Sequence, residues 1–332
     1  MKKYLGVVMF VGIILFVTAC KKEANNINAD VHVPEQTKAT QNDITQAPTE
    51  AKTQPSTETV TEPQTYVLKE GVIDSNPDVW GQRYTYIDHF DQEFSMVLQQ
   101  NADKTTFDTT RLKVNGKKYE YYSEDGSKLI SKWGVDVSGY QGYINWNKLK
   151  EQGVEFAIIR LGYRGYGQYG NIVYDTRFKE NIKGAIDAGI EVGVYFFSQA
   201  LNDKEALEEA EFVINALREY EITYPVVFDT EAIDASLNPR TKDITRDRVT
   251  KNCIIFCDAI NEAGYKSMIY YNMPWCAKML DLEKLNPYDI WYADYTGVPQ
   301  SPYKFSMWQY TEKGRIDGVN GDIDFDIYII EE

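Results

Sequence analysis

The chain has 332 residues, of which 43% are hydrophobic and 14% aromatic, so it is too apolar to be disordered throughout. Its 50 acidic residues exceed its 35 Lys and Arg residues, and the resulting net charge of -15 repels polyanions; we expect no nucleic-acid partner. The two histidines and four cysteines show no zinc-ligand spacing, so no metal is expected.

The N-terminus reads as an export signal. Lys2 and Lys3 precede an apolar run at 5–17, which is short for a bilayer span. The run ends in Val-Thr-Ala-Cys, which resembles the cleavage and lipidation site of bacterial lipoproteins. We therefore predict a lipoprotein signal peptide at 1–19 and lipidation of Cys20, so that the chain is extracytoplasmic and anchored to the cell membrane or envelope. An ordinary signal peptide or an uncleaved anchor helix is the alternative.

A linker and a small module are predicted next. Residues 21–65 contain no Phe, Tyr or Trp and are rich in Thr, Gln and Pro, so we expect a disordered linker over 20–65. Residues 66–132 are aromatic and turn-rich, and Asn115-Gly116 and Asp125-Gly126 favour hairpin turns. This predicts a small β-rich module. A wall-binding role and a spacer packed on the next domain are both open.

From residue 133 to 332, apolar strand-like runs alternate with amphipathic stretches, the pattern of βα units in an α/β fold. Helices are expected at 145–152, 176–188, 203–220 and 245–263, and Gly153, Gly189 and Gly264 are expected to cap three of them. The eight predicted strands are 134–138, 156–163, 191–198, 224–231, 266–272, 289–295, 305–311 and 323–329. Because the last three strands leave little room for helices, we predict a TIM-like barrel with an irregular second half.

Acidic residues lie at several strand ends. Asp229 and Glu231 are two residues apart, so they point to the same side of a strand, and repulsion between two carboxylates favours retention of one proton. Glycosidic bond cleavage needs this combination of an acid and a negative charge. Asp136 and Asp324 are expected at the same end of the barrel as this pair, which we call its mouth. Solvated loop residues or helix N-caps are the alternative for a single pair of this kind.

Aromatic side chains that could stack on sugar rings also lie near the strand ends. We take these residues, with Gln309, as candidates for substrate binding: Tyr195, Phe197, Tyr270, Trp291, Tyr295 and Trp308. Alternation prevents Trp308 and Tyr310 from sharing the face of Gln309, and the sequence does not give the face that opens to the mouth.

Residues 134–332 resemble the glycoside hydrolase family 25 muramidases, also called Chalaropsis-type lysozymes. The resemblance rests on six segments in the family's order: GVDVSGYQGYINWNKLKEQGVEFAIIRLGYRGYGQYG, YDTRFKENIKGAIDAGIEVGVYFFSQA, YPVVFDTE, GYKSMIYYN, IWYADY and WQYTEKGRIDGVNGDIDFD. It implies a (β/α)5β3 barrel that hydrolyses the β-1,4 bond between N-acetylmuramic acid and N-acetylglucosamine in peptidoglycan.

The resemblance also assigns roles to the acids. Glu231 corresponds to the general acid and Asp229 to the residue that stabilises the substrate N-acetyl group, while Asp136 and Asp324 support the site. It implies retention of configuration, either through the substrate's own acetamido oxygen or through an aspartate nucleophile, and no cofactor. Two departures are Phe196, where members often have His, and Asp326, where they often have Asn; these put subsite preference in doubt.

Two other function classes stay open on the sequence. One is a non-catalytic lipoprotein that binds peptidoglycan, and the other is a chitin-type N-acetylglucosaminidase. The expected partners are peptidoglycan glycan strands and, through the lipid anchor, a membrane, with the chain itself a monomer. The sequence does not choose among wall remodelling, division, germination and attack on other cells. Cys253 and Cys257 are expected to be buried free thiols, because helical i, i+4 geometry suits a disulfide poorly, while the sequence leaves open a pairing of either residue with Cys276.

Overall fold

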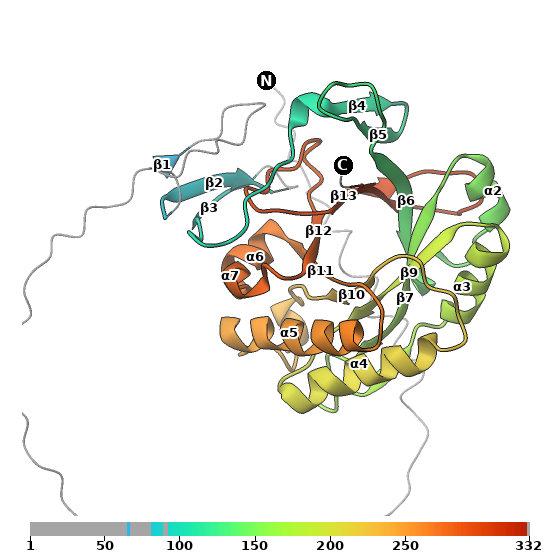
Figure 1. Ribbon diagram of the computed structural model, residues 1–332. Coiled ribbons are helices and arrows are strands. Elements are labelled where there is room, and N and C mark those ends of the chain that lie inside the picture. The colour runs from blue at the N-terminus through green and yellow to red at the C-terminus, as the bar shows by residue number, and fades with distance from the viewer. Residues whose placement is uncertain (1–64, 67–80, 89–91, 331–332) are drawn as a thin grey trace, which may run out of the picture. The chain divides into compact units, whose positions relative to one another are not determined.

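Eight strands with apolar residues on both faces close into a barrel (Figure 1). The computed structural model describes residues 65–66, 81–88 and 92–330. The barrel strands are β6 (Ser131–Val137), β7 (Phe156–Arg164), β9 (Glu191–Phe197), β10 (Val226–Asp229), β11 (Ser267–Asn272), β12 (Asp289–Ala293), β13 (Met307–Gly314) and β14 (Ile323–Ile329). β6 pairs with both β7 and β14, which closes the ring and confirms the predicted barrel.

The strands from β6 to β13 that form the ring run parallel, whereas β14 is antiparallel to both of its neighbours. A short strand, β8 (Ile172–Tyr174), pairs with β7 outside the ring and was not predicted. Side chains alternate between two cores. Phe156, Ile158 and Met268 belong to the core inside the barrel, and Ala157 and Ile159 to the core around it.

Helices cover the first half of the barrel, as the sequence predicts. They are α2 (Trp146–Glu151), α3 (Phe178–Asp187), α4 (Asp203–Leu217) and α5 (Arg246–Glu262), followed by the short α6 (Met273–Met279) and α7 (Leu282–Leu285). Gly153, Gly189 and Gly264 have φ of +86°, +71° and +89°, which confirms them as left-handed caps. Residues 294–306 and 315–322, which join the last three strands, contain no helix.

Short β-structures precede the barrel, in line with the predicted β-rich module. They are β1 (Thr65–Tyr66), β2 (Arg83–Ile87), β3 (Glu93–Val97), β4 (Leu112–Asn115) and β5 (Lys118–Tyr121). A single-turn 3-10 helix at Thr109–Arg111 lies among them, and two more follow barrel strands, at Gly139–Gln141 and Ala235–Leu237. β4 and β5 form a hairpin in which Gly116 has φ +64°. The predicted signal peptide, Cys20 and the linker as far as residue 64 lie outside the described residues.

The segment 81–130, in its described residues 81–88 and 92–130, covers the barrel where helices are missing. Its side chains share one hydrophobic core with the outer faces of β12, β13 and β14. The ring of Tyr119 lies 5.0 Å from that of Trp308, and the ring of Phe107 lies 5.3 Å from that of Phe305. Tyr84 donates a hydrogen bond to the carbonyl of Gln300 at 2.6 Å. This segment therefore covers the outer face of the second half of the barrel, as the crossover helices cover that of the first half.

Cys253 and Cys257 are free and buried, as predicted, and so is Cys276, whose pairing the sequence left open. Over the part of the chain that the structure describes, none of the helices has the length and apolar character needed to cross a membrane.

Candidate active site

Acidic side chains from three strands meet at one end of the barrel. Asp229 is the last residue of β10, and its register neighbours are Phe197 on β9 and Tyr270 on β11. Asp136, near the end of β6, pairs directly with Asp324 at the start of the antiparallel β14. The strand that was predicted at 224–231 ends at residue 229, so Glu231 lies in the loop that follows. The structure thus brings together the four acids that the sequence singled out.

Burial raises the pKa values of both the Asp229 and the Glu231 carboxyls, and the negative charge of Glu231 adds to the rise at Asp229. For Asp229, burial and then the negative charge of Glu231 raise the pKa well above its usual range, and the positive charge of Arg160 opposes them. Part of the Glu231 side chain is exposed, but burial still raises its pKa to about 7, with Arg160 lowering it and Glu312 raising it. A proton is therefore retained in this pair near neutral pH.

A second group of carboxyls lies beside the first. Burial raises the pKa of Asp136 well above its usual range, and the neighbouring Asp326 raises it further. The pKa of Asp324 is also raised, by burial and then by Asp136. Asp326 is fully buried and accepts a 2.9 Å hydrogen bond from the indole of Trp291. Few of these acids can be ionised together in so small a volume.

Gln309 joins three of the predicted residues in one hydrogen-bond network. Its amide donates to Asp136 at 2.6 Å, and its carbonyl oxygen accepts from the hydroxyls of Tyr270 and Tyr295 at 3.0 and 2.6 Å. All of these side chains face the inside of the barrel. The network fixes the orientation of Asp136 and leaves its second carboxyl oxygen for other contacts.

The predicted aromatic residues divide between the two faces of the barrel. Tyr195, Tyr270, Trp291 and Tyr295 belong to the inner core below the acids, and Phe197 neighbours Asp229 in the sheet. Trp308 does not join them, because it points outward, is fully buried, and contacts Phe107 and Tyr119. Its predicted role in substrate binding is wrong for this reason.

The two departures from the family pattern also lie on opposite faces. Phe196 is fully buried outside the barrel and packs against Phe212 on α4, with ring centroids 6.0 Å apart. Phe196 therefore does not face the acids, and an effect of this departure on subsite preference stays a prediction. Asp326 does face the acid group, and one of its carboxyl oxygens is buried without a hydrogen-bond partner among the described residues.

Sequence reasoning missed Arg160, Asp175 and Glu312. Arg160 lies on the inner face of β7, forms a 2.7 Å ion pair with Asp175, and lowers the pKa of Glu231. A signal was present, since an arginine interrupts the inward positions of an otherwise apolar strand. Glu312 lies near the end of β13 and is exposed, and no sequence pattern distinguishes it from a solvated residue.

The group is incomplete in a way that fits a substrate site. The Oδ1 atom of Asp229 is buried and has no hydrogen-bond partner in the described part of the chain. Leaving a buried acceptor unpaired costs free energy, so such an atom is suited to a donor that a ligand brings. An N–H group of an N-acetyl sugar is a donor of this kind.

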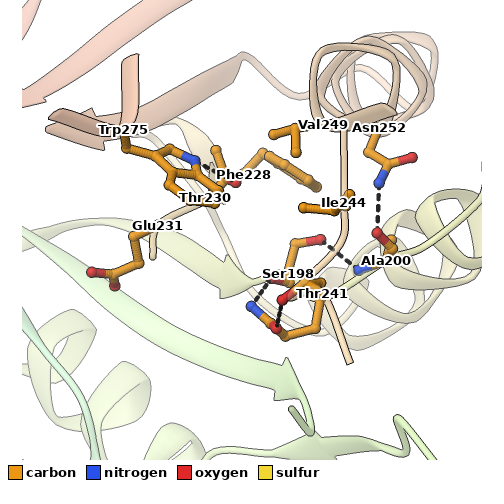
Figure 2. Close-up of a pocket in the computed structure, with 11 residues that line it drawn as sticks. Ser198, Ala200, Phe228, Thr230, Glu231, Thr241, Ile244, Val249, Asn252 and Trp275 are labelled. Atoms are coloured by element: carbon orange, nitrogen blue, oxygen red, sulfur yellow. Dashed lines mark hydrogen bonds between the residues drawn. The ribbon is translucent and has the colours of Figure 1, made fainter. Parts of the chain in front are cut away.

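A small cavity lies behind Glu231, between the ends of β9 and β10 and the helix α5 (Figure 2). Its volume is about 20 Å³, the space of about one water molecule, so it does not admit a sugar. Thr230 and Trp275 line it, whereas Asp136, Asp229 and Asp324 do not. Of the four acids only Glu231 lines it, so the cavity adjoins that residue and lies outside the group formed by the other three. Among the described residues, no cluster of three or more His, Cys, Asp or Glu side chains could hold a metal ion.

Comparison with known proteins identifies relatives of the barrel. Residues 135–319 match the family described as Glycosyl hydrolases family 25. The "Autolytic lysozyme" of Clostridium acetobutylicum is 25% identical over 194 residues, which cover 58% of this chain and 54% of that protein. "Lysozyme M1" of Streptomyces globisporus is 28% identical over 205 residues, covering 58% and 65%. The chain spans between about half and two thirds of the length of these relatives.

A solved structure shares the fold. It is the modular autolysin LytC of Streptococcus pneumoniae in complex with a synthetic peptidoglycan ligand, with a TM-score of 0.55 and 23% identity, covering 74% of this chain and 56% of that chain. At this identity the likeness establishes the architecture of the barrel.

Proposed function

The chain belongs to glycosyl hydrolase family 25, and from this we propose that it is a cell-wall muramidase. Its reaction is hydrolysis of the β-1,4 bond between N-acetylmuramic acid and N-acetylglucosamine in peptidoglycan. The observation that carries the proposal is the meeting of Asp136, Asp229, Glu231 and Asp324 at one end of the barrel, with the pKa of Glu231 at about 7. The names of the lysozymes and of the autolysin that match the chain support the substrate.

Glu231 is the proposed general acid. A carboxyl with a pKa near 7 keeps its proton at neutral pH and can give it to the leaving glycosidic oxygen. Positive charge then develops on the sugar ring, and the surrounding carboxylates stabilise it. Arg160 limits the rise of the Glu231 pKa because its positive charge stabilises the carboxylate that remains after the proton is given up. That carboxylate takes a proton back from the water molecule that hydrolyses the intermediate.

Asp229 is proposed to hold the substrate N-acetyl group. Its unpaired, buried Oδ1 atom can accept the acetamido N–H, which turns the acetamido oxygen toward the anomeric carbon. Attack by that oxygen on the anomeric carbon breaks the bond to the leaving glycosidic oxygen and forms a cyclic intermediate. Water then attacks the same carbon and reopens the ring, so the two displacements give retention without a protein nucleophile. Asp136 and Asp324 support this arrangement. The rings of Tyr195, Phe197, Tyr270 and Tyr295 supply apolar walls for the sugars, whereas Trp291, which the sequence also predicted to bind sugar, is buried beneath them and donates its hydrogen bond to Asp326.

Product analysis tests the proposal. The purified full-length protein is incubated with peptidoglycan, and the products are reduced with borohydride and identified by mass spectrometry. A muramidase leaves reduced N-acetylmuramic acid at the new ends. Reduced N-acetylglucosamine would instead indicate the glucosaminidase alternative. Peptidoglycan that binds but is not cleaved would indicate a non-catalytic wall-binding protein.

We also propose that the enzyme acts outside the cytoplasm and is held at the membrane by lipid on Cys20. The support is the apolar run at 5–17 followed by Val-Thr-Ala-Cys. In cells fed labelled palmitate, the wild-type chain should take up label and a Cys20→Ser variant should not. Label that persists in the variant contradicts the anchor.

A further inference from the structure

Thr230 lies between the two acids and points away from them. Phe228 belongs to the outer core and Asp229 faces inward, so alternation places Thr230 on the outer side of β10. There its hydroxyl accepts a 3.0 Å hydrogen bond from the indole N–H of Trp275. Figure 2 shows the indole beside Thr230 and the Glu231 carboxyl on the other side of the backbone.

The backbone needs this support, because the sheet ends here. The carbonyl of Asp229 still accepts a 3.0 Å hydrogen bond from Ser198, but the next contact, from the Thr230 N–H to Tyr270, is stretched to 3.5 Å. Within the described part of the chain, the Glu231 carboxyl has no hydrogen-bond donor. Its direction therefore depends on the backbone that carries it, and the small cavity behind Thr230 leaves room for that backbone to shift.

Trp275 is well placed to hold Thr230. It lies in the first turn of α6, which follows β11 without a loop. Asn272 caps this helix by accepting a 3.0 Å hydrogen bond from the backbone N–H of Trp275, and Pro274 fixes the first turn. The indole donor is thus anchored to a neighbouring barrel strand before it meets Thr230.

We propose that Trp275 is a positioning residue for the acid pair, whose indole N–H holds Thr230 and so aims Glu231 into the cleft. The inference rests on the proposed function, in which Glu231 is the general acid. Trp275 has no hydrogen bond to the Asp229 or Glu231 carboxyl in the described part of the chain. It acts through Thr230, by fixing the backbone conformation between these two acids.

Three variants of the full-length protein test this. Trp275→Phe removes the N–H and keeps a ring, Thr230→Val removes the acceptor and keeps the shape, and Thr230→Ser keeps the hydroxyl. On soluble peptidoglycan strands, we expect the first two to lower kcat on the order of 10- to 100-fold with KM unchanged, since small displacements of reacting groups have effects of this size. Thr230→Ser should retain wild-type kcat. The Trp275→Phe/Thr230→Val double variant should be no worse than either single variant.

A matched control is Trp133→Phe, which removes an indole N–H that bonds Tyr310 at 2.7 Å in the outer core. It should lower Tm and leave kcat unchanged. Three outcomes would overturn the inference. They are a wild-type kcat in either Trp275→Phe or Thr230→Val, losses that multiply in the double variant, and a rise in KM with kcat unchanged. Thr230→Val decides the question if Trp275→Phe does not fold. A wild-type protein that fails to cleave peptidoglycan overturns the proposed function itself, and the inference with it.

Discussion

At the scale of single residues, the pKa of Glu231 reflects opposing effects. Burial disfavours the ionised carboxyl, Arg160 favours it, and Glu312 disfavours it again, with a pKa of about 7 as the result. A carboxyl at its usual pKa would be almost fully ionised at pH 7 and a poor acid there. The surroundings of Glu231 therefore make acid catalysis possible at neutral pH.

A pH profile tests this balance. Because the acid must be protonated, kcat/KM should be sustained below about pH 7 and fall by about tenfold per unit above it. Glu312→Gln removes a negative charge that raises the pKa of Glu231, so the fall should begin at a lower pH in this variant. A profile that stays flat through the alkaline range, or a shift to higher pH in Glu312→Gln, contradicts the assignment.

The acids could be predicted from the sequence, because carboxylates at strand ends in a barrel must share its mouth. The sequence could not predict whether Trp308 faces the inside or the outside of the barrel. Barrel strands are apolar on both sides, so alternation gives two sets of residues without telling which set is inside. Only the packing of Trp308 against Phe107 and Tyr119 decides this, and those residues are far away in the sequence.

At the scale of elements, a buried ion pair joins α4 to the barrel near the site. Arg164 at the end of β7 donates to Glu209 on α4 at 2.7 Å, and Ser198, next to the end of β9, donates to the same carboxylate at 2.6 Å. Glu209 is fully buried. Removing Glu209 would leave the buried Arg164 guanidinium with the carbonyls of Gly170 and Glu205 and the more distant, part-exposed Glu208 as its partners, without its buried counter-charge. This pair therefore fixes the loop that carries Ser198 beside Asp229.

Glu209→Ala should accordingly destabilise the protein by about 3–5 kcal/mol, measured as the shift in urea unfolding. The matched control is Asp187→Ala, which breaks the pair of Asp187 with Lys183 on the surface of α3, where side chains are 62% and 72% exposed. Exposed pairs are worth less than about 1 kcal/mol. Equal losses in the two variants would show that burial does not set the contribution of the Arg164–Glu209 pair.

Most elements could be predicted, since long amphipathic helices with N-caps and glycine C-caps leave clear patterns. The short elements α6, α7 and β8 could not be predicted from the sequence. The 7 residues of α6 and the 3 of β8 are too few for a periodicity, and Pro274 reads as a helix breaker although it sits in the first turn. β10 is shorter than predicted because the ladder ends at Asp229.

At the scale of the whole molecule, the described residues form one compact unit. The segment 81–130 packs on the half of the barrel that lacks crossover helices, and it buries Trp308 and Tyr310. β6 begins at Ser131, so the chain passes from this segment directly into the barrel. We propose that the region predicted as a small β-rich module at 66–132 is required for the barrel to fold.

Truncation tests this proposal. A chain of residues 131–332 keeps β6 intact but exposes the outer faces of Trp308, Tyr310 and Phe305. Each buried aromatic side chain contributes roughly 1.5–3 kcal/mol, so the loss of three is comparable to the roughly 5–15 kcal/mol by which a typical domain is stable. We expect the truncated chain to aggregate or to lose its cooperative thermal transition. A soluble truncated chain with the Tm of the longer protein would instead identify an independent domain.

The most direct test of the central claim is the activity of Glu231→Gln on peptidoglycan, compared with wild type and with Glu211→Gln, an exposed position on α4. The glutamine has the size of the glutamate and no proton to donate, so release of muropeptides should fall by a factor on the order of 10² to 10⁴ while Tm is retained. Glu211→Gln should match wild type. A folded Glu231→Gln protein that cleaves peptidoglycan at the wild-type rate would contradict the account.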